Sequence, residues 1–187
     1  MATAKTGSFY LTETVTLPAG SAAGTRVQST IDLGAYVNVA TGQAVAIESV
    51  DFVYQSGATY SQELKNFLTA DGCISVQVAD LNPGNALLRA DDHSLVASAA
   101  LNIDDSNNIG SEVADFYPDN FGPTALSEAF LVVNDSLYLN AGMDSSGAGT
   151  VNAIDALHVT ARIKCRVAKL SNKDWMAIAI QSTASDN

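Results

Sequence analysis

The sequence predicts an all-β fold, a sandwich or barrel of eight strands. Apolar and polar residues alternate with a period of two over most of the chain, as in strands with one buried face. Turn-forming residues interrupt this alternation at short intervals, which is typical of antiparallel sheets. The length of 187 residues is that of one domain, and 47% hydrophobic residues suffice for a core. We therefore expect residues 1–187 to form a single β domain.

The first two predicted strands each have one apolar face. In the segment Phe9–Leu17 every second residue is apolar except Glu13, which interrupts that face. A turn rich in Ala and Gly leads to a second strand near residues 26–33. Its inward residues are Val27, Ile31 and Leu33.

The third predicted strand contains a change of phase. Its inward apolar residues run to Ile47 and resume at Val50, so the buried face changes parity between them. A β-bulge near Glu48 and Ser49 would produce this change.

A short helix and two more strands are predicted in the middle of the chain. Residues Tyr60–Leu68 have helical spacing and are followed by a glycine stop at Gly72. The fourth strand covers Cys73–Leu81. The segment Ala86–Ile103 is ambiguous between helix and strand, and we assign its second half, from Leu95, to a strand.

The segment Asp104–Thr124 is predicted to be irregular, because it has two prolines and no sustained period. Connections of this length usually serve a function or cover another surface. Its aromatic residues Phe116, Tyr117 and Phe121 are costly to leave in water and do not fit a strand period. We therefore expect this segment to lie against a neighbouring subunit.

A tight hairpin is predicted next. Asn134 and Asp135 suit the positive φ of a two-residue turn, and they separate the strand-like segments Glu128–Val133 and Ser136–Ala141. The sequence Asn134-Asp135-Ser136 is also an N-glycosylation sequon.

The C-terminal third ends with a loop, a long strand and a helix. A Ser- and Gly-rich loop, Met143–Thr150, precedes a final strand over Val151–Val167. Ser171 and Asp174 form a capping pair for a short helix that continues to Ile180. We expect the inward strand faces to share one core, whose predicted members are Val27, Ile31, Phe52, Ile74, Val76, Val159 and Ile163.

Motifs for catalysis and metal binding are scarce. The two histidines, His93 and His158, belong to no His-x-His or His-Glu-x-x-His pattern. The tripeptide Asp92-His93-Ser94 is more typical of a loop than of a catalytic triad. The acidic segment 102–108 could hold Ca²⁺, but it lacks the spaced Asp-x-Asp-x-Asp-Gly pattern, and a solvated turn is favoured. We expect no enzymatic activity, no cofactor and no metal site.

Charge and hydropathy argue against two further classes of function. The 9 Lys and Arg against 20 Asp and Glu give a net charge of -11, which disfavours direct nucleic-acid binding because such binding depends on neutralising phosphates. No apolar run approaches the about 18 residues of a membrane-spanning helix. The start of the chain has no apolar region typical of a signal peptide.

Candidate interface residues come from the cysteines, the irregular segment and one basic strand face. Cys73 falls on the outer face of its strand and Cys165 on the inner face of the last strand, so we expect no disulfide between them. Outward-facing cations on the last strand form either a solvated face or a docking site for an acidic neighbour, such as a second copy. The candidates are Cys73, Phe116, Tyr117, Phe121, Arg162, Lys164 and Arg166.

The composition and the strand plan together resemble one family. Fifteen of the acids are Asp and only five residues are Lys, a surface typical of proteins in concentrated salt, although an ordinary acidic surface would also explain it. The chain begins Met-Ala-Thr-Ala-Lys-Thr-Gly-Ser-Phe-Tyr-Leu-Thr-Glu-Thr-Val. In these features and in size it resembles the smaller major capsid protein of tailless, membrane-containing icosahedral viruses of halophilic archaea.

This resemblance implies an eight-stranded single jelly-roll barrel or sandwich with short helical insertions and a short C-terminal helix. In that family, a smaller and a larger single-barrel protein stand upright and tile a shell over an internal lipid membrane. The implied location is the virion capsid, built from proteins made in the host cytoplasm. The implied partners are copies of this chain and the larger capsid protein, with no direct nucleic-acid contact.

Two other classes of protein remain open at this point. A cell-surface or S-layer-like β-sandwich would use the sequon at Asn134 as a glycan site. A jelly-roll carbohydrate-binding module would need exposed aromatic residues on one sheet face, but the only Trp, Trp175, falls in the predicted C-terminal helix.

Overall fold

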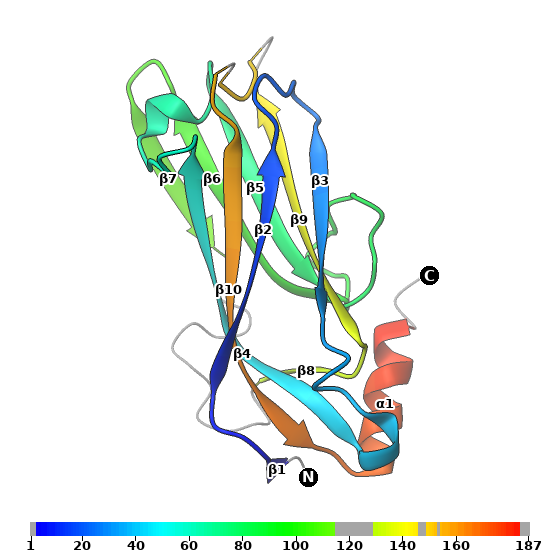
Figure 1. The fold of residues 1–187 in the computed structure, drawn as a ribbon. Coiled ribbons are helices and arrows are strands. Elements are labelled where there is room, and N and C mark those ends of the chain that lie inside the picture. The colour runs from blue at the N-terminus through cyan, green and yellow to red at the C-terminus, as the bar shows by residue number, and fades with distance from the viewer. Residues whose placement is uncertain (1–2, 115–128, 146–148, 153, 184–187) are drawn as a thin grey trace.

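Two antiparallel sheets packed face to face make up the computed structural model, which describes residues 3–114, 129–145, 149–152 and 154–183 (Figure 1). The first sheet has the order β2 (Phe9–Leu17), β10 (Leu157–Lys169), β4 (Gln43–Ser56) and β8 (Phe130–Val132), with β1 (Thr3–Ala4) also paired to β10. The second has the order β3 (Arg26–Asp32), β9 (Ser136–Ser145), β5 (Gly72–Ala79), β6 (Leu95–Asp104) and β7 (Ile109–Ala114). Within these residues the helical elements are two 3₁₀ turns, η1 (Val39–Thr41) and η2 (Leu64–Asn66), and the helix α1 (Asn172–Thr183).

The strand order is that of a jelly roll. When β1 and β7 are left aside and the other strands are numbered along the chain, the two sheets read 1-8-3-6 and 2-7-4-5. Two interlocked Greek keys distributed over two sheets produce this order. The predicted all-β jelly-roll fold with a short C-terminal helix is therefore confirmed.

The core lies between the two sheets and follows the predicted strand faces. Ile31, Ile74, Val76, Val159 and Ile163 are buried in one cluster, and the other two predicted members, Val27 and Phe52, pack against it while partly exposed. Alternate residues of β10 point away from this core, so the predicted register is confirmed.

The predicted bulge and the predicted C-terminal helix are both present. Along β4 and β10, Lys164 pairs with Ser49 and Cys165 with Ile47, which leaves Glu48 as the extra residue. At the start of α1, the Ser171 hydroxyl oxygen accepts a hydrogen bond from the Asp174 N–H at 3.2 Å. The helix then covers a small second cluster at the lower end of the first sheet (Figure 1).

The predicted helix over Tyr60–Leu68 is wrong except for the single turn η2. Outside η2, the backbone of this segment bonds to other segments: the Ser61 N–H donates to the Ser56 carbonyl and the Asn152 N–H to the Phe67 carbonyl. Phe67 and Leu68 are buried in the core, so apolar burial and long-range pairing override the local helical spacing.

The predicted hairpin at Asn134 and Asp135 is also wrong. β8 pairs with β4 in the first sheet, whereas β9 lies between β3 and β5 in the second. The two residues therefore form a corner between sheets, and the Leu33 N–H donates to the Asp135 carbonyl at 2.7 Å. Turn-forming residues between two strand-like segments do not reveal whether those strands pair with each other.

Three predicted boundaries also change. Residues 109–114 of the predicted irregular segment form β7, which pairs with β6. The predicted loop over Met143–Thr150 starts too early, because β9 continues to Ser145. The final strand begins at Leu157 rather than at Val151, which instead forms an isolated bridge with Leu68.

Candidate functional site

A buried carboxylate at the β-bulge organises the basic face of β10. Glu48 is only 2% exposed, and its two carboxylate oxygens accept hydrogen bonds from the Ser8 hydroxyl at 3.1 and 3.0 Å. The Arg166 guanidinium also donates to this carboxylate, and the Lys164 ammonium lies 3.4 Å from it. The bulge turns Glu48 toward these cations, and they compensate a charge that would be costly to bury alone.

These four residues, Glu48, Ser8, Lys164 and Arg166, form the Glu48 cluster. Next to it, the N-terminal arm, residues 3–8, is bonded to the sheet. The Lys5 N–H donates to the Val167 carbonyl at 2.9 Å, and the Val167 N–H donates to the Thr6 hydroxyl at 3.0 Å. Together with the Ser8 contact to Glu48, these bonds attach residues 3–8 to β10 and β4. The arrangement can act as an internal clamp.

The outward-facing cations predicted on the last strand therefore have two different roles. Lys164 and Arg166 pair with Glu48 inside the subunit, with their side chains 39% and 30% exposed. Arg162 is exposed and lies over the Tyr10 ring, with 5.7 Å between the guanidinium carbon and the ring centroid. The docking role predicted for these three cations stays a prediction, and Arg162 is the member most available to a partner.

The cysteines occupy the predicted faces, and both are free thiols. Cys165 is fully buried, and burial raises the pKa of its thiol to about 12, so it behaves as a small apolar residue. Cys73 is half-buried, with its sulfur 3.5 Å from the Ser75 hydroxyl. Its interface role stays a prediction, and Phe116, Tyr117 and Phe121 lie outside the described residues.

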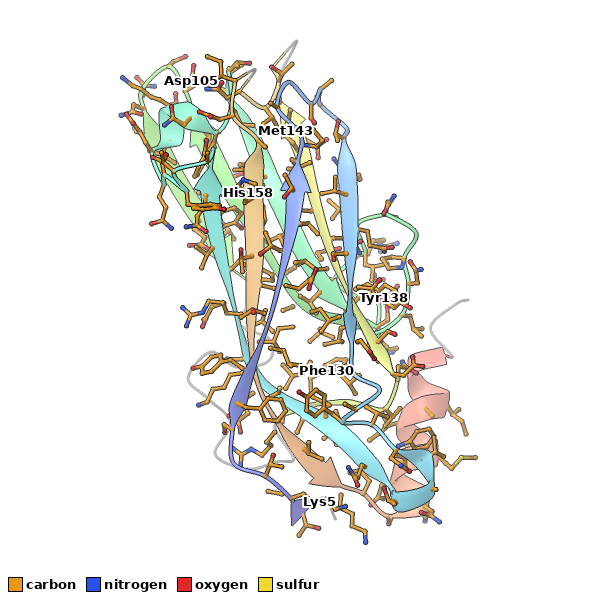
Figure 2. All side chains as sticks on the ribbon, viewed as in Figure 1. Lys5, Asp105, Phe130, Tyr138, Met143 and His158 are labelled. Atoms are coloured by element: carbon orange, nitrogen blue, oxygen red, sulfur yellow. The ribbon has the colours of Figure 1, made fainter. Side chains whose placement is uncertain are left out.

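Neither histidine forms a catalytic arrangement with other described residues. His93 is exposed, and the neighbouring Ser94 hydroxyl donates to Asp92 at 2.7 Å instead of to an imidazole. His158 lies on the outer face of β10, toward the upper end of the sandwich in Figure 2, with its Nδ1 2.9 Å from the Thr16 hydroxyl. Among the residues that the structure describes, no three His, Cys, Asp or Glu side chains are grouped as a metal site.

The acidic segment between β6 and β7 uses its oxygen atoms to build a turn. Asp104 accepts hydrogen bonds from the side chain and backbone of Asn107, and these hold the pKa of its carboxyl below the usual range. The Asp105 N–H donates to Asp71 at 2.9 Å. Figure 2 shows Asp105 at the upper tip of the molecule, far from Lys5 at the lower end. This geometry agrees with the solvated turn favoured above.

Buried polar groups beneath the connection between β5 and β6, residues 80–94, were not predicted. Gln77 donates to the Leu88 carbonyl at 2.9 Å and accepts from the Leu88 N–H at 2.6 Å, which fixes this connection over the outer sheet face. The amide atoms of Asn140, which is 1% exposed, have no hydrogen-bond partner among the described residues. Both residues occupy outward-facing strand positions, where the sequence pattern predicts solvated side chains. For Gln77, the contact with Leu88 explains the burial that the pattern did not predict.

Asp80 directly follows the last residue of β5 in the same region. It is 2% exposed, and burial together with the nearby charge of Asp92 raises the pKa of its carboxyl to about 7. The Asn134 side-chain N–H₂ donates to the Asp80 backbone carbonyl at 3.1 Å.

No helix among the described residues is long and apolar enough to cross a membrane.

The comparisons with known proteins do not identify the fold, which is assigned from the strand order. No family model matches the sequence, and no curated protein matches it. Among solved structures, a chain of Desmodium yellow mottle tymovirus is 9% identical, with a TM-score of 0.36 over 88% of this chain and 90% of that one. A chain of the Nora virus structure is 12% identical, with a TM-score of 0.31 over 91% of this chain and 60% of that one. Scores this low do not establish a shared fold.

Proposed function

We propose that this chain is a structural subunit of a viral capsid. The observation that carries the proposal is the strand order, two four-stranded sheets in jelly-roll order with only short additions. Jelly rolls form viral capsids, lectin domains and cupins, so the fold restricts the choice of function without deciding it. The acidic, lysine-poor composition supports a finer proposal, the smaller major capsid protein of a membrane-containing icosahedral virus of a halophilic archaeon.

In this proposal the subunit stands upright in a shell above a lipid membrane. Its partners are further copies of the chain and a larger single-barrel capsid protein. The long strands β4 and β10 give an elongated sandwich, and Figure 1 places β1 and α1 at the same end of it. This shape suits a subunit that presents one end to the outside and the other to the membrane.

Neither alternative class gains support from the residues that bear on it. The side-chain nitrogen of Asn134, which would carry a glycan, already donates to Asp80 and is part-buried. Trp175 is only partly exposed and packs with α1 against the first sheet, so it offers no aromatic platform for a sugar.

Antibodies against the purified chain test the proposal on cultures of the source organism. Label on lipid-containing icosahedral particles in electron micrographs supports it, and label confined to cell envelopes overturns it in favour of a surface-layer subunit.

Salt dilution tests the halophilic part. Labelled particles should loosen below molar salt, because the Debye length grows from about 3 Å at 1 M to about 30 Å at 0.01 M and repulsion between acidic subunits increases. Particles that stay intact at low salt without divalent cations contradict that part.

A further inference from the structure

In the described part of the chain, β7 lies at the edge of its sheet. β7 pairs with β6 and with no other strand in the described part of the chain, and Figure 1 shows it as the outermost strand of its sheet. An edge strand presents unpaired backbone N–H and C=O groups that can bind another strand. Proteins usually guard such edges with charged residues, Pro or a bulge. β7 reads Ile-Gly-Ser-Glu-Val-Ala, so Glu112 is its single charged residue, and it pairs with β6 in an unbroken register.

One face of β7 also exposes apolar side chains. Ile109 is 58% exposed and Val113 is 57% exposed, and Ser111 lies between them on the same face. On the opposite face, Leu64 covers Gly110 so closely that a Cβ atom there would lie 2.8 Å from its methyl groups. The free edge and the exposed β-branched residues therefore lie side by side, as in a surface that accepts another strand.

We propose that two copies of this chain pair through β7, antiparallel and centred on Ser111. In this register Ile109 of each copy lies opposite Val113 of the other, which forms two cross-strand pairs of β-branched residues. Ser111 lies opposite Ser111, and each Glu112 lies opposite a Gly110, so no two carboxylates face each other. The five-residue sequence Ile-Gly-Ser-Glu-Val is thus complementary to itself, as a two-fold contact requires.

Neighbouring registers lack this complementarity. A shift of two residues in one direction places the two Glu112 side chains opposite each other, and a shift in the other direction places Val113 opposite Asn107 in the turn. A shift of one residue brings Ile109 to the face of Glu112. Self-complementarity in one register identifies the partner strand as a second copy of β7 rather than an unrelated extended segment.

This inference goes beyond the proposed function, because a pair joined through β7 needs neither a virus nor a shell. The mass of the purified chain in molar NaCl, measured by sedimentation over a range of concentrations, should change from monomer to dimer. Val113→Lys should raise the dimer dissociation constant about tenfold or more, since it removes both apolar pairs and adds a charge at the edge. The matched control is Val39→Lys, which changes an exposed valine in η1 and should leave the dissociation constant unchanged.

Cross-linking tests the register in a Cys73→Ser background. Ser111→Cys places the two thiols at the two-fold axis with Cβ atoms about 4.5 to 5.5 Å apart, close enough for a disulfide after small adjustments. Mild oxidation should link this variant much faster than Thr30→Cys, a control at an exposed position on β3. A chain that stays monomeric, a dimer that Val113→Lys leaves intact, or equal cross-linking of the two variants overturns the proposal. Failure to find the chain in virions changes none of these outcomes.

Discussion

Replacing Arg166 by Met tests whether the Glu48 cluster is a stabilising clamp. The Glu48 side chain is 3% exposed, and without Arg166 its carboxylate keeps, among the described residues, the Lys164 ammonium at 3.4 Å and the Ser8 hydroxyl. Breaking a buried ion pair by removing one partner costs about 3 to 5 kcal/mol. Because two partners remain, we expect Arg166→Met to lower the free energy of unfolding by about 2 to 3 kcal/mol. In a domain of this size that corresponds to a fall in Tm of about 5 to 10 °C.

Replacing the carboxylate itself should lower the free energy of unfolding by less. Glu48→Gln leaves Lys164 and Arg166 without a carboxylate, but both side chains reach water, so we expect a loss of about 1 kcal/mol. The double variant should then be more stable than Arg166→Met alone, because the buried charge without its main partner has been removed.

Urea unfolding followed by circular dichroism, in one fixed salt concentration, measures all of these variants. Urea is preferred to guanidinium, which would itself screen the ion pairs. The matched control is Arg162→Met, which removes an exposed cation from the same face of β10 and should cost at most about 1 kcal/mol. If Arg166→Met costs no more than this control, or if the double variant is the least stable, the cluster is not a clamp.

Three further substitutions test other parts of the structure. Asp80 has its pKa raised to about 7 by burial, so its contribution to stability is complete below about pH 4 and is lost as the pH rises to 7. Thermal unfolding should show Asp80→Asn more stable than the wild type at pH 8, and an equal or lower Tm there would contradict the assignment. Gln77→Leu should release residues 80–94 and accelerate trypsin cleavage at Arg89, as read by mass spectrometry, and an unchanged rate would mean that other contacts hold this connection. Gly72→Ala should destabilise the fold by about 1 to 3 kcal/mol in urea, because its Cβ would lie 2.6 Å from a backbone carbonyl oxygen, whereas Gly7→Ala has open space and should be neutral.

The faces of the strands could be predicted from the sequence because each depends on local alternation. The parity change between Ile47 and Val50 located the bulge at Glu48, since a bulge is the local feature that shifts alternation by one residue. The same alternation along the last strand placed Cys165 inside and Arg162 outside. The role of Glu48 itself was not predicted, because its partners Ser8 and Arg166 are far away in the chain.

The errors arise where distant segments decide the structure. The Asn134-Asp135 corner has the local sequence of a hairpin, yet β8 and β9 belong to different sheets. β7 lacked a clear signal because its apolar residues Ile109 and Val113 are separated by Ser111 on their face, so the apolar alternation is interrupted. Its strand conformation depends on pairing with β6, which sequence alternation does not report.

The exposed edge of β7 also bears on how an acidic protein can associate with itself. Four cations, Arg26, Arg89, Lys164 and Arg166, pair with carboxylates inside the described part of the subunit, which reduces the positive charge available to neighbours. Contacts between copies built from side-chain ion pairs would therefore have few donors among 20 acids and 9 bases. A strand edge binds through backbone N–H and C=O groups, which every residue except proline supplies regardless of net charge. Concentrated salt then needs only to screen the general repulsion between copies, because the specific contacts at β7 do not depend on charge pairs.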